Sequence, residues 1–285
     1  MKYIKVVLVA LLMCSSAYAQ DDLLKELDST WASKPSTSNA FKGLQICSMQ
    51  STKVAAKKEF YTVVSHRFGD LQHGFDNFFG MDNALTKIGV IYGLTDWLSV
   101  AGSRHTYNKT YELAAKYRLA LQKEGASPVT IVGYNTWDIN SELEKELYPN
   151  LKSTDRFAFS TQLLISRKFS ESVSAEIAPV YIHKNLYEPL YEEKDQFLVA
   201  AGGRCKITKR MSINLEYAAR VNTPESTTLY KNPLTFGLDI ETGGHIFQLV
   251  FSNSQPMNDV SYYTNAAGNW GKGSAYFGFN MYRVF

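Results

Sequence analysis

The sequence predicts an all-β protein, a single up-and-down antiparallel transmembrane β-barrel of about twelve strands with a short N-terminal extension. Three observations predict this fold. Apolar and polar residues alternate with a period of two from about residue 57 to residue 285, which is the pattern of strands with two unlike faces. Long and short connections alternate along the same region, as they do in outer-membrane barrels. The first residues also resemble an export signal.

Residues 1–19 show the three parts of a cleavable signal peptide. Lys2 and Lys5 give a basic start, an apolar run follows, and residues 17–19 fit the small-x-small cleavage rule. We therefore expect export and a location in the bacterial outer membrane. A lipid anchor on Cys14 is the alternative, but the residues just before this cysteine are large, which disfavours it.

Residues 20–56 lack the period-two pattern of the rest of the chain. Leucine residues at helical spacing predict a short amphipathic helix at 21–31, and residues 41–49 have the composition of a short strand. Three alternatives stay open for this part: a periplasmic extension, a plug inside the lumen, or an additional strand. We expect the barrel itself at residues 57–285.

The alternation is clearest in the fourth predicted strand. Tyr111 and Leu113 share an apolar face, whereas Glu112 and Lys116 share a charged one, as expected for a wall between lipid and a polar interior. Pro179 lies within the seventh strand and cannot donate to the ladder, so we expect a bulge or bend there. The predicted strands cover residues 57–68, 84–94, 97–106, 110–121, 128–137, 155–168, 172–183, 196–207, 210–221, 233–241, 245–254 and 273–285.

The connections indicate how the strands are joined. Apart from one short link at residues 107–109, longer and shorter connections alternate. In an up-and-down barrel this gathers the tight turns at one end and the long loops at the other, whereas a Greek-key sandwich has no reason to produce the pattern. The long outer loops are expected at residues 69–83, 138–154, 184–195, 222–232 and 255–272.

The composition excludes several classes of protein. The net charge of +3 is too small to indicate nucleic acid as a partner. Mean hydropathy is negative, and no run long enough for a transmembrane helix follows the signal. The aromatic content of 13% fits the aromatic girdles of a membrane barrel. Only Cys47 and Cys205 follow the signal, which excludes a disulfide scaffold and leaves open whether these two pair.

The sequence shows no motif for catalysis, cofactor binding or metal binding. The five histidines lack the spacing of a metal site, and a strand pattern rather than a helix follows Gly243-Gly244. A barrel-embedded lipid hydrolase is the enzymatic alternative. Ser103 and His105 share a strand face, but positions two apart in a strand are separated by about 7 Å, which argues against a hydrogen bond. We therefore expect a protein that is not an enzyme.

Charged residues at strand positions predict the character of the interior. A charge in lipid costs several kcal/mol, so these side chains are expected to point inward. One interpretation is a passive pore for small solutes. The other is a non-conducting structural or interaction barrel whose lumen is cross-linked by ion pairs. The candidate lumen-lining residues are Lys116, Arg118, Arg156, Glu176, Arg204, Lys206, Glu216 and Arg220.

Several short runs are similar to those of a known family. They are Ser65–Gly69, Asn77–Ala84, Tyr92–Asp96, Thr242–Leu249, Ser252–Gln255 and Arg283–Phe285. On these runs the chain resembles an uncharacterised outer-membrane β-barrel family of Bacteroidetes, a domain-of-unknown-function family, over residues 41–285. The resemblance implies a barrel and brings no catalytic residues.

The last residues also resemble the signal read by the outer-membrane insertion machinery. Phe285 is preceded at alternating positions by apolar residues, except that Arg283 departs from the pattern. The expected partners are therefore outer-membrane lipid and, through Phe285, the insertion machinery.

Overall fold

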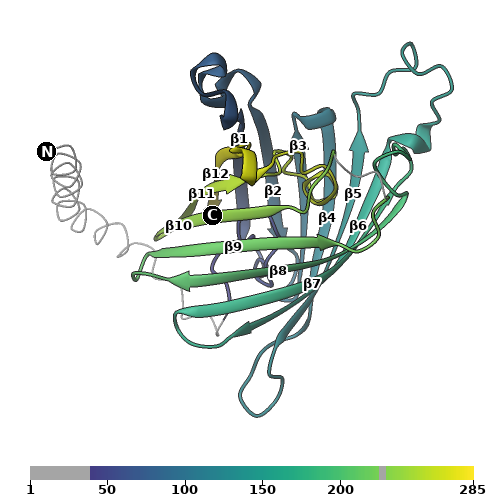
Figure 1. Ribbon diagram of the computed structural model, residues 1–285. Coiled ribbons are helices and arrows are strands. Elements are labelled where there is room, and N and C mark those ends of the chain that lie inside the picture. The colour runs from purple at the N-terminus through teal and green to yellow at the C-terminus, as the bar shows by residue number, and fades with distance from the viewer. Residues whose placement is uncertain (1–38, 225–228) are drawn as a thin grey trace, which may run out of the picture.

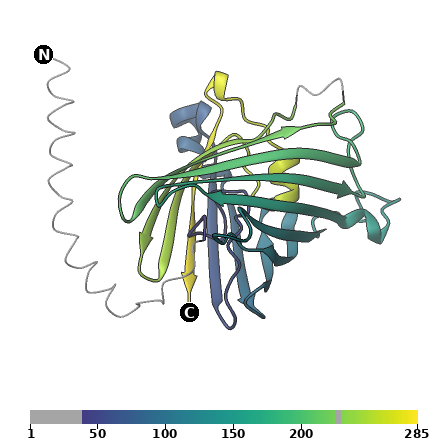
Figure 2. The same cartoon turned by 90° about the horizontal axis from the view of Figure 1, so that it is seen from below.

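The computed structural model describes residues 39–224 and 229–285. The predicted signal peptide at 1–19 and the predicted helix at 21–31 lie outside these residues. Twelve strands form one antiparallel sheet that closes on itself, which confirms the predicted fold (Figures 1 and 2). The strands are β1 (Phe60–Asp70), β2 (Leu85–Gly93), β3 (Leu98–His105), β4 (Thr110–Ala120), β5 (Thr130–Asn140), β6 (Phe157–Lys168), β7 (Val173–Lys184), β8 (Asp195–Lys206), β9 (Met211–Arg220), β10 (Leu234–Thr242), β11 (His245–Ser252) and β12 (Tyr276–Val284).

The barrel closes between its first and last strands. β1 pairs with β12 in an antiparallel register that sets Val64 opposite Met281, and every other strand pairs with its neighbours in the sequence. Because each strand has a partner on both sides, the sheet has no open edge with unpaired backbone groups. This is the up-and-down order that the alternating connections predicted.

The two faces of the wall differ as the sequence alternation predicted. On β4, Tyr111 and Leu113 are each 50% exposed on the outside, whereas Glu112 and Lys116 are 3% and 5% exposed on the inside. The apolar outer face suits contact with lipid acyl chains, and the polar inner face is typical of membrane barrels.

The helical elements of the described chain are short and lie in the connections. None of them is long and apolar enough to cross a membrane. Four are 3₁₀ helices, three of them in long loops and η3 in the short link between β3 and β4: η2 (Leu71–Asn83), η3 (Tyr107–Lys109), η4 (Ser153–Arg156) and η5 (Trp270–Lys272).

The loop before β12 corrects a prediction. We expected residues 255–272 to form an outer loop, but the helix α3 (Asp259–Thr264) within this loop is buried along its whole length. In Figure 2 its yellow coil lies within the ring of strands. The physical reason is apolar burial, because Tyr262 and Tyr263 belong to a core cluster that also includes Leu164 on the lumen face of β6.

The seventh strand corrects a second prediction. Pro179 faces outward on β7, and the registers with β8 and β6 are the same on both sides of it, so the bulge is not formed, although the ladder with β6 is interrupted at Ala178 and Pro179. A missing N–H removes one ladder bond and leaves the strand otherwise able to pair. The register instead shifts in β1, between Arg67 and Asp70, and in β4.

Candidate functional site in the barrel lumen

The lumen is filled by two segments of the chain itself. Residues 39–56, which we call the luminal segment, precede β1, and residues 253–266 belong to the loop before β12. At mid-barrel the inward side chains of Glu216, Gln248 and Gln162 are 0%, 0% and 1% exposed. Side chains that line an open channel would be accessible to water. The barrel in this state is therefore closed at its centre.

The tip of the luminal segment is a tight hairpin. Gln45 and Gln50 pair across it in an antiparallel bridge. The turn between them aims the backbone N–H groups of residues 47–49 at the carboxylate of Glu216 on β9, at 2.6, 3.1 and 3.0 Å. Successive backbone N–H groups that converge in this way form an anion-binding concavity, and hydrogen bonds to a charged acceptor are stronger than neutral ones. Glu216 therefore holds the hairpin by its backbone.

The carbonyl groups of the hairpin are held from other sides of the lumen. The ammonium of Lys116 on β4 donates to the carbonyls of Leu44 and Ser51, at 2.8 and 3.1 Å. The amide of Asn280 on β12 donates to the carbonyl of Cys47 at 2.7 Å. A buried turn needs partners for its backbone polar groups, and here side chains of the barrel wall provide them.

Two inward-facing glycines make room for the hairpin. A Cβ atom at Gly237 on β10 would lie 2.2 Å from Sγ of Cys47, and one at Gly202 on β8 would lie 2.6 Å from Cδ1 of Ile46. Both separations are shorter than van der Waals contact allows, so a larger residue at either position would force the facing side chain of the hairpin to shift. The wall therefore leaves space where the side chains of Cys47 and Ile46 lie.

The helix α3 fills the rest of the lumen centre. Oδ1 of Asp259 accepts a hydrogen bond from Gln162 at 2.9 Å, and its backbone N–H donates to Glu112 at 3.2 Å. The hydroxyl of Tyr262 donates to Glu216 at 3.2 Å, so the carboxylate that binds the hairpin also contacts α3. Burial, followed by the charge of Glu112, raises the pKa of Asp259 to about 6. The site thus favours the neutral form of this carboxyl more than water does.

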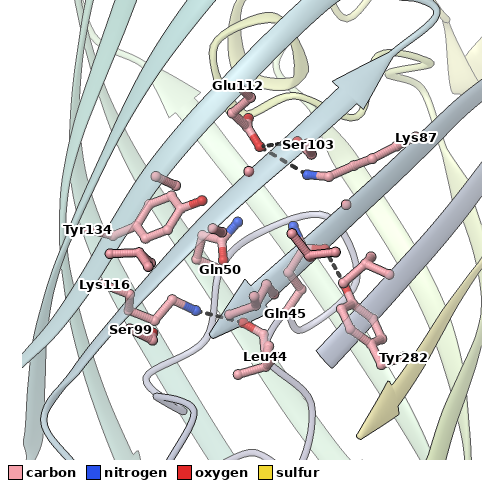
Figure 3. A pocket seen from close by; sticks show the side chains of 18 residues that line it. Leu44, Gln45, Gln50, Lys87, Ser99, Ser103, Glu112, Lys116, Tyr134 and Tyr282 are labelled. Atoms are coloured by element: carbon pink, nitrogen blue, oxygen red, sulfur yellow. Dashed lines mark hydrogen bonds and ion pairs between the residues drawn. The ribbon is translucent and has the colours of Figure 1, made fainter. Parts of the chain in front are cut away.

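The hairpin and α3 meet at the centre of the barrel. The side-chain amide of Gln50 donates to Asp259 at 3.1 Å. Beside this contact a cavity of about 40 Å³ remains between the hairpin and the wall. It has room for a few water molecules at most, since each needs about 10–15 Å³. Figure 3 shows Lys87, Glu112 and Lys116 around this cavity, with Gln50 reaching in from the hairpin.

The structure brings three of the predicted lumen residues to the luminal segment. Lys116 and Glu216 bind the hairpin, and Glu176 on β7 accepts from the backbone N–H of Thr52 at 3.0 Å. Arg204 lies apart from these three and forms an ion pair with Glu241. We predicted a lumen cross-linked by ion pairs as one alternative, and the structure shows isolated pairs such as this one. The contacts with the hairpin are instead mostly hydrogen bonds to its backbone groups.

The other four predicted residues lie toward the ends of the barrel. Arg118 and Lys206 are half-buried near the tight-turn ends of their strands. Arg156 is part of η4 and donates to the carbonyl of Asn140 at 3.2 Å. Arg220, at the loop end of β9, donates to a backbone carbonyl at 3.4 Å. These four do not form one site.

Uncharged residues of the site were missed by the sequence analysis. Asn214 and Gln248 donate to the carbonyl of Ile46 at 3.1 and 2.6 Å, and Gly202 and Gly237 shape the wall. A search based on charge passes over amides and glycines. The signal that would have found them is their inward position on the strands.

Ser103 and His105 are closer than predicted. Oγ of Ser103 lies 2.9 Å from Nε2 of His105, because the two side chains lean toward each other, so the argument from strand spacing was wrong. Ser103 also donates to Glu112 at 3.0 Å, and Glu112 pairs with Lys87 at 3.1 Å. Nδ1 of His105 has no partner among the described residues, although a catalytic triad places its carboxylate there. The cluster is a polar network without the geometry of a triad.

The described chain contains neither a disulfide nor a cluster of metal-binding side chains. Cys47 is free and buried in the hairpin, and Cys205 is free and exposed on β8, so the two do not pair. Within residues 39–224 and 229–285, no three or more His, Cys, Asp or Glu side chains are arranged to hold a metal ion.

Several solved structures of outer-membrane proteins are similar to this chain at low sequence identity. The NanC porin shares 8% identity with a TM-score of 0.49, covering 79% of this chain and 99% of that one. The KdgM porin in complex with disordered oligogalacturonate shares 7% with a TM-score of 0.49, covering 80% and 99%. Omp33 of Acinetobacter baumannii shares 8% with a TM-score of 0.44, covering 81% and 100%.

No curated protein sequence matches the chain. A family model does match it, over residues 41–285, and thus over nearly all of the part that the structure describes. The chain belongs to the family of the membrane-bound β-barrel domain DUF5777.

Proposed function

We propose that this protein is an outer-membrane barrel that is closed at rest and becomes a passive pore for small solutes when the luminal segment withdraws. The observation that supports it most directly is the binding of the hairpin. Glu216 and Lys116, two of the charged groups at mid-barrel, are bound to the hairpin's backbone N–H and carbonyl groups. The hairpin therefore stands where water or a solute would otherwise be bound.

The polar character of the lumen supports the proposal that the barrel also has an open state, without the hairpin inside it. An interior built only to stay filled is more stable with apolar side chains, because burying a charge costs free energy even when the charge is paired. Glu176, Glu216 and Lys116 are buried, and the luminal segment contacts each of them. Water can replace the hairpin at each of these groups. The open barrel would then have the hydrated polar lumen typical of porins.

The proposal also covers where the protein is located and whether it catalyses a reaction. The signal peptide expected at residues 1–19 would direct export, and Phe285 would be recognised by the insertion machinery of the outer membrane. The barrel would act without catalysis, as a passage whose state depends on the position of residues 39–56.

Conductance in planar bilayers tests the proposal. The full-length protein should show little or no steady current, whereas a variant lacking residues 39–53 should form long-lived open channels. A matched control removes residues 144–148, which are exposed in the loop between β5 and β6, and should stay closed. Steady conductance of the unmodified protein at the level of the deletion variant would show that the hairpin does not close the lumen. A deletion variant that is folded but silent would show that α3 by itself keeps the lumen closed, and would favour the non-conducting structural barrel over the proposed role of the luminal segment.

A further inference from the structure

The outer wall of β4, β5 and β6 carries a polar row at its middle. The strand registers place three outward rows of three residues across this wall, and the middle row crosses β5 at its centre, at the sixth of eleven positions. The rows are Leu113, Trp137 and Phe159, then Ala115, Asn135 and Thr161, then Tyr117, Gly133 and Leu163. In a membrane barrel the middle of a strand lies near the midplane of the bilayer.

The two polar side chains of the middle row are hydrogen-bonded to each other and to Tyr117 of the next row. The hydroxyl of Tyr117 donates to Oδ1 of Asn135 at 3.1 Å, and Nδ2 of Asn135 donates to Oγ1 of Thr161 at 2.8 Å. The ring of Tyr117 lies over Gly133, where a Cβ atom would be 2.3 Å from it. The glycine therefore lets the ring lie flat and aim its hydroxyl at the amide.

Hydrogen-bonding capacity is left over in this row. One N–H of Asn135 and the hydroxyl hydrogen of Thr161 have no acceptor among the described residues. Acyl chains offer no acceptor at this depth, so the groups would stay unsatisfied against lipid. Polar side chains within a membrane are rare and usually have a partner.

The middle row also lines a groove. The groove has a volume of about 410 Å³, and its lining includes the apolar side chains of Leu113, Trp137 and Phe159. These three side chains are 50%, 38% and 38% exposed. An occupant must therefore offer apolar surface to these three side chains and hydrogen-bonding groups to Asn135 and Thr161.

We propose that this wall is the contact surface of a homodimer within the membrane. A two-fold axis parallel to the membrane normal brings identical residues of two copies to the same depth. Asn135 would then face Asn135 of the second copy, and a carboxamide is both donor and acceptor, so two amides satisfy each other. Trp137 and Phe159 would supply the apolar part of the contact. A lipid chain would fill the groove but leave the amide unsatisfied. The inference does not depend on the state of the lumen.

The first test is the oligomeric state in a mild detergent, measured by native mass spectrometry. The unmodified protein should be mainly dimeric, and Asn135→Leu and Thr161→Val should each raise the dissociation constant at least tenfold. Thr62→Val is the matched control, since Thr62 faces outward on β1, on a different part of the wall, and should leave the dimer unchanged. Heat-dependent migration in SDS gels checks that every variant is folded.

The second test is disulfide cross-linking in the membrane. In a Cys205→Ser background, Ala115→Cys in the middle row should cross-link two copies, and Thr62→Cys should not. A monomeric unmodified protein would overturn the proposal, as would cross-linking at both positions or a dimer unaffected by Asn135→Leu. A monomer that carries one tightly bound lipid, lost in Asn135→Leu, would assign the groove to lipid instead.

Discussion

At the residue scale, Glu216 does more than any other single side chain to hold the hairpin. Its carboxylate accepts three backbone N–H groups of residues 47–49 and the hydroxyl of Tyr262. The ammonium group of Lys116 donates hydrogen bonds to two backbone carbonyl groups of the hairpin. Because both residues bind backbone atoms, the interaction depends on the shape of the hairpin more than on its side chains.

The first prediction concerns this carboxylate. Glu216→Gln keeps the size of the side chain but replaces one oxygen by an NH₂ group and removes the charge. We expect the docking of the hairpin to weaken by about 2 kcal/mol, the usual contribution of hydrogen bonds to a charged group. Hydrogen exchange at the amides of residues 47–49 measures this, and the rate should rise roughly 30-fold. Glu171→Gln, in an exposed turn where the carboxylate is 88% accessible, should not change it. Equal rates in Glu216→Gln and the unmodified protein would mean that the carboxylate does not hold the hairpin.

At the scale of elements, the hairpin and the wall fit by size as well as by hydrogen bonding. Gly237 leaves space for Cys47, and Gly202 leaves space for Ile46. Such a fit at two strands sets the depth to which the hairpin enters. It also explains why the apolar residues of the luminal segment can be buried in a lumen whose other side chains are largely polar.

The close fit predicts that a larger residue at position 237 can be compensated by a smaller one at position 47. In Gly237→Ala the new Cβ atom would lie 2.2 Å from Sγ of Cys47 but 3.5 Å from its Cβ. The single change should therefore loosen the hairpin by about 1–3 kcal/mol, as overpacking does, and Cys47→Ala added to it should restore docking. Protection of the hairpin amides against exchange reports both effects. Gly203→Ala is the control, because a Cβ atom there meets nothing closer than 3.6 Å. If the double variant were as loose as the single one, the contact between these two residues would not exist.

At the scale of the whole molecule, the sequence was sufficient for the wall and insufficient for its contents. The alternation that placed Glu112 inside and Leu113 outside is a local property of each strand, and pairing in sequence order followed from the connection lengths. The predicted strand ends differ from the observed ones by a few residues, as for β1, which begins at Phe60 rather than at residue 57.

The contents of the lumen depend on contacts between residues distant in the sequence. The amides of residues 47–49 meet a carboxylate more than 160 positions away, with a separation of 169 for Cys47 and Glu216. No local pattern records such a pair. The loop containing Asp259 was predicted to be an outer loop because it is long. Its tyrosines pack against the lumen face of the wall, and this contact between distant residues places it inside the barrel.

The central claim is that residues 39–56 occupy the lumen, and one cysteine introduced into the wall tests it most directly. In Gly237→Cys, with Cys205→Ser to remove the outer thiol, the two Cβ atoms at positions 47 and 237 would be 3.5 Å apart, which suits a disulfide. Mild catalysed oxidation of the protein in membranes should link Cys47 to position 237 almost completely, as mass spectrometry of the joined peptides would show, whereas Gly203→Cys on the outer face of β8 should not link. If Cys47 instead stays free and reacts with a water-soluble maleimide as fast as it does in the unfolded chain, the hairpin is not in the lumen and the closed barrel described here is wrong.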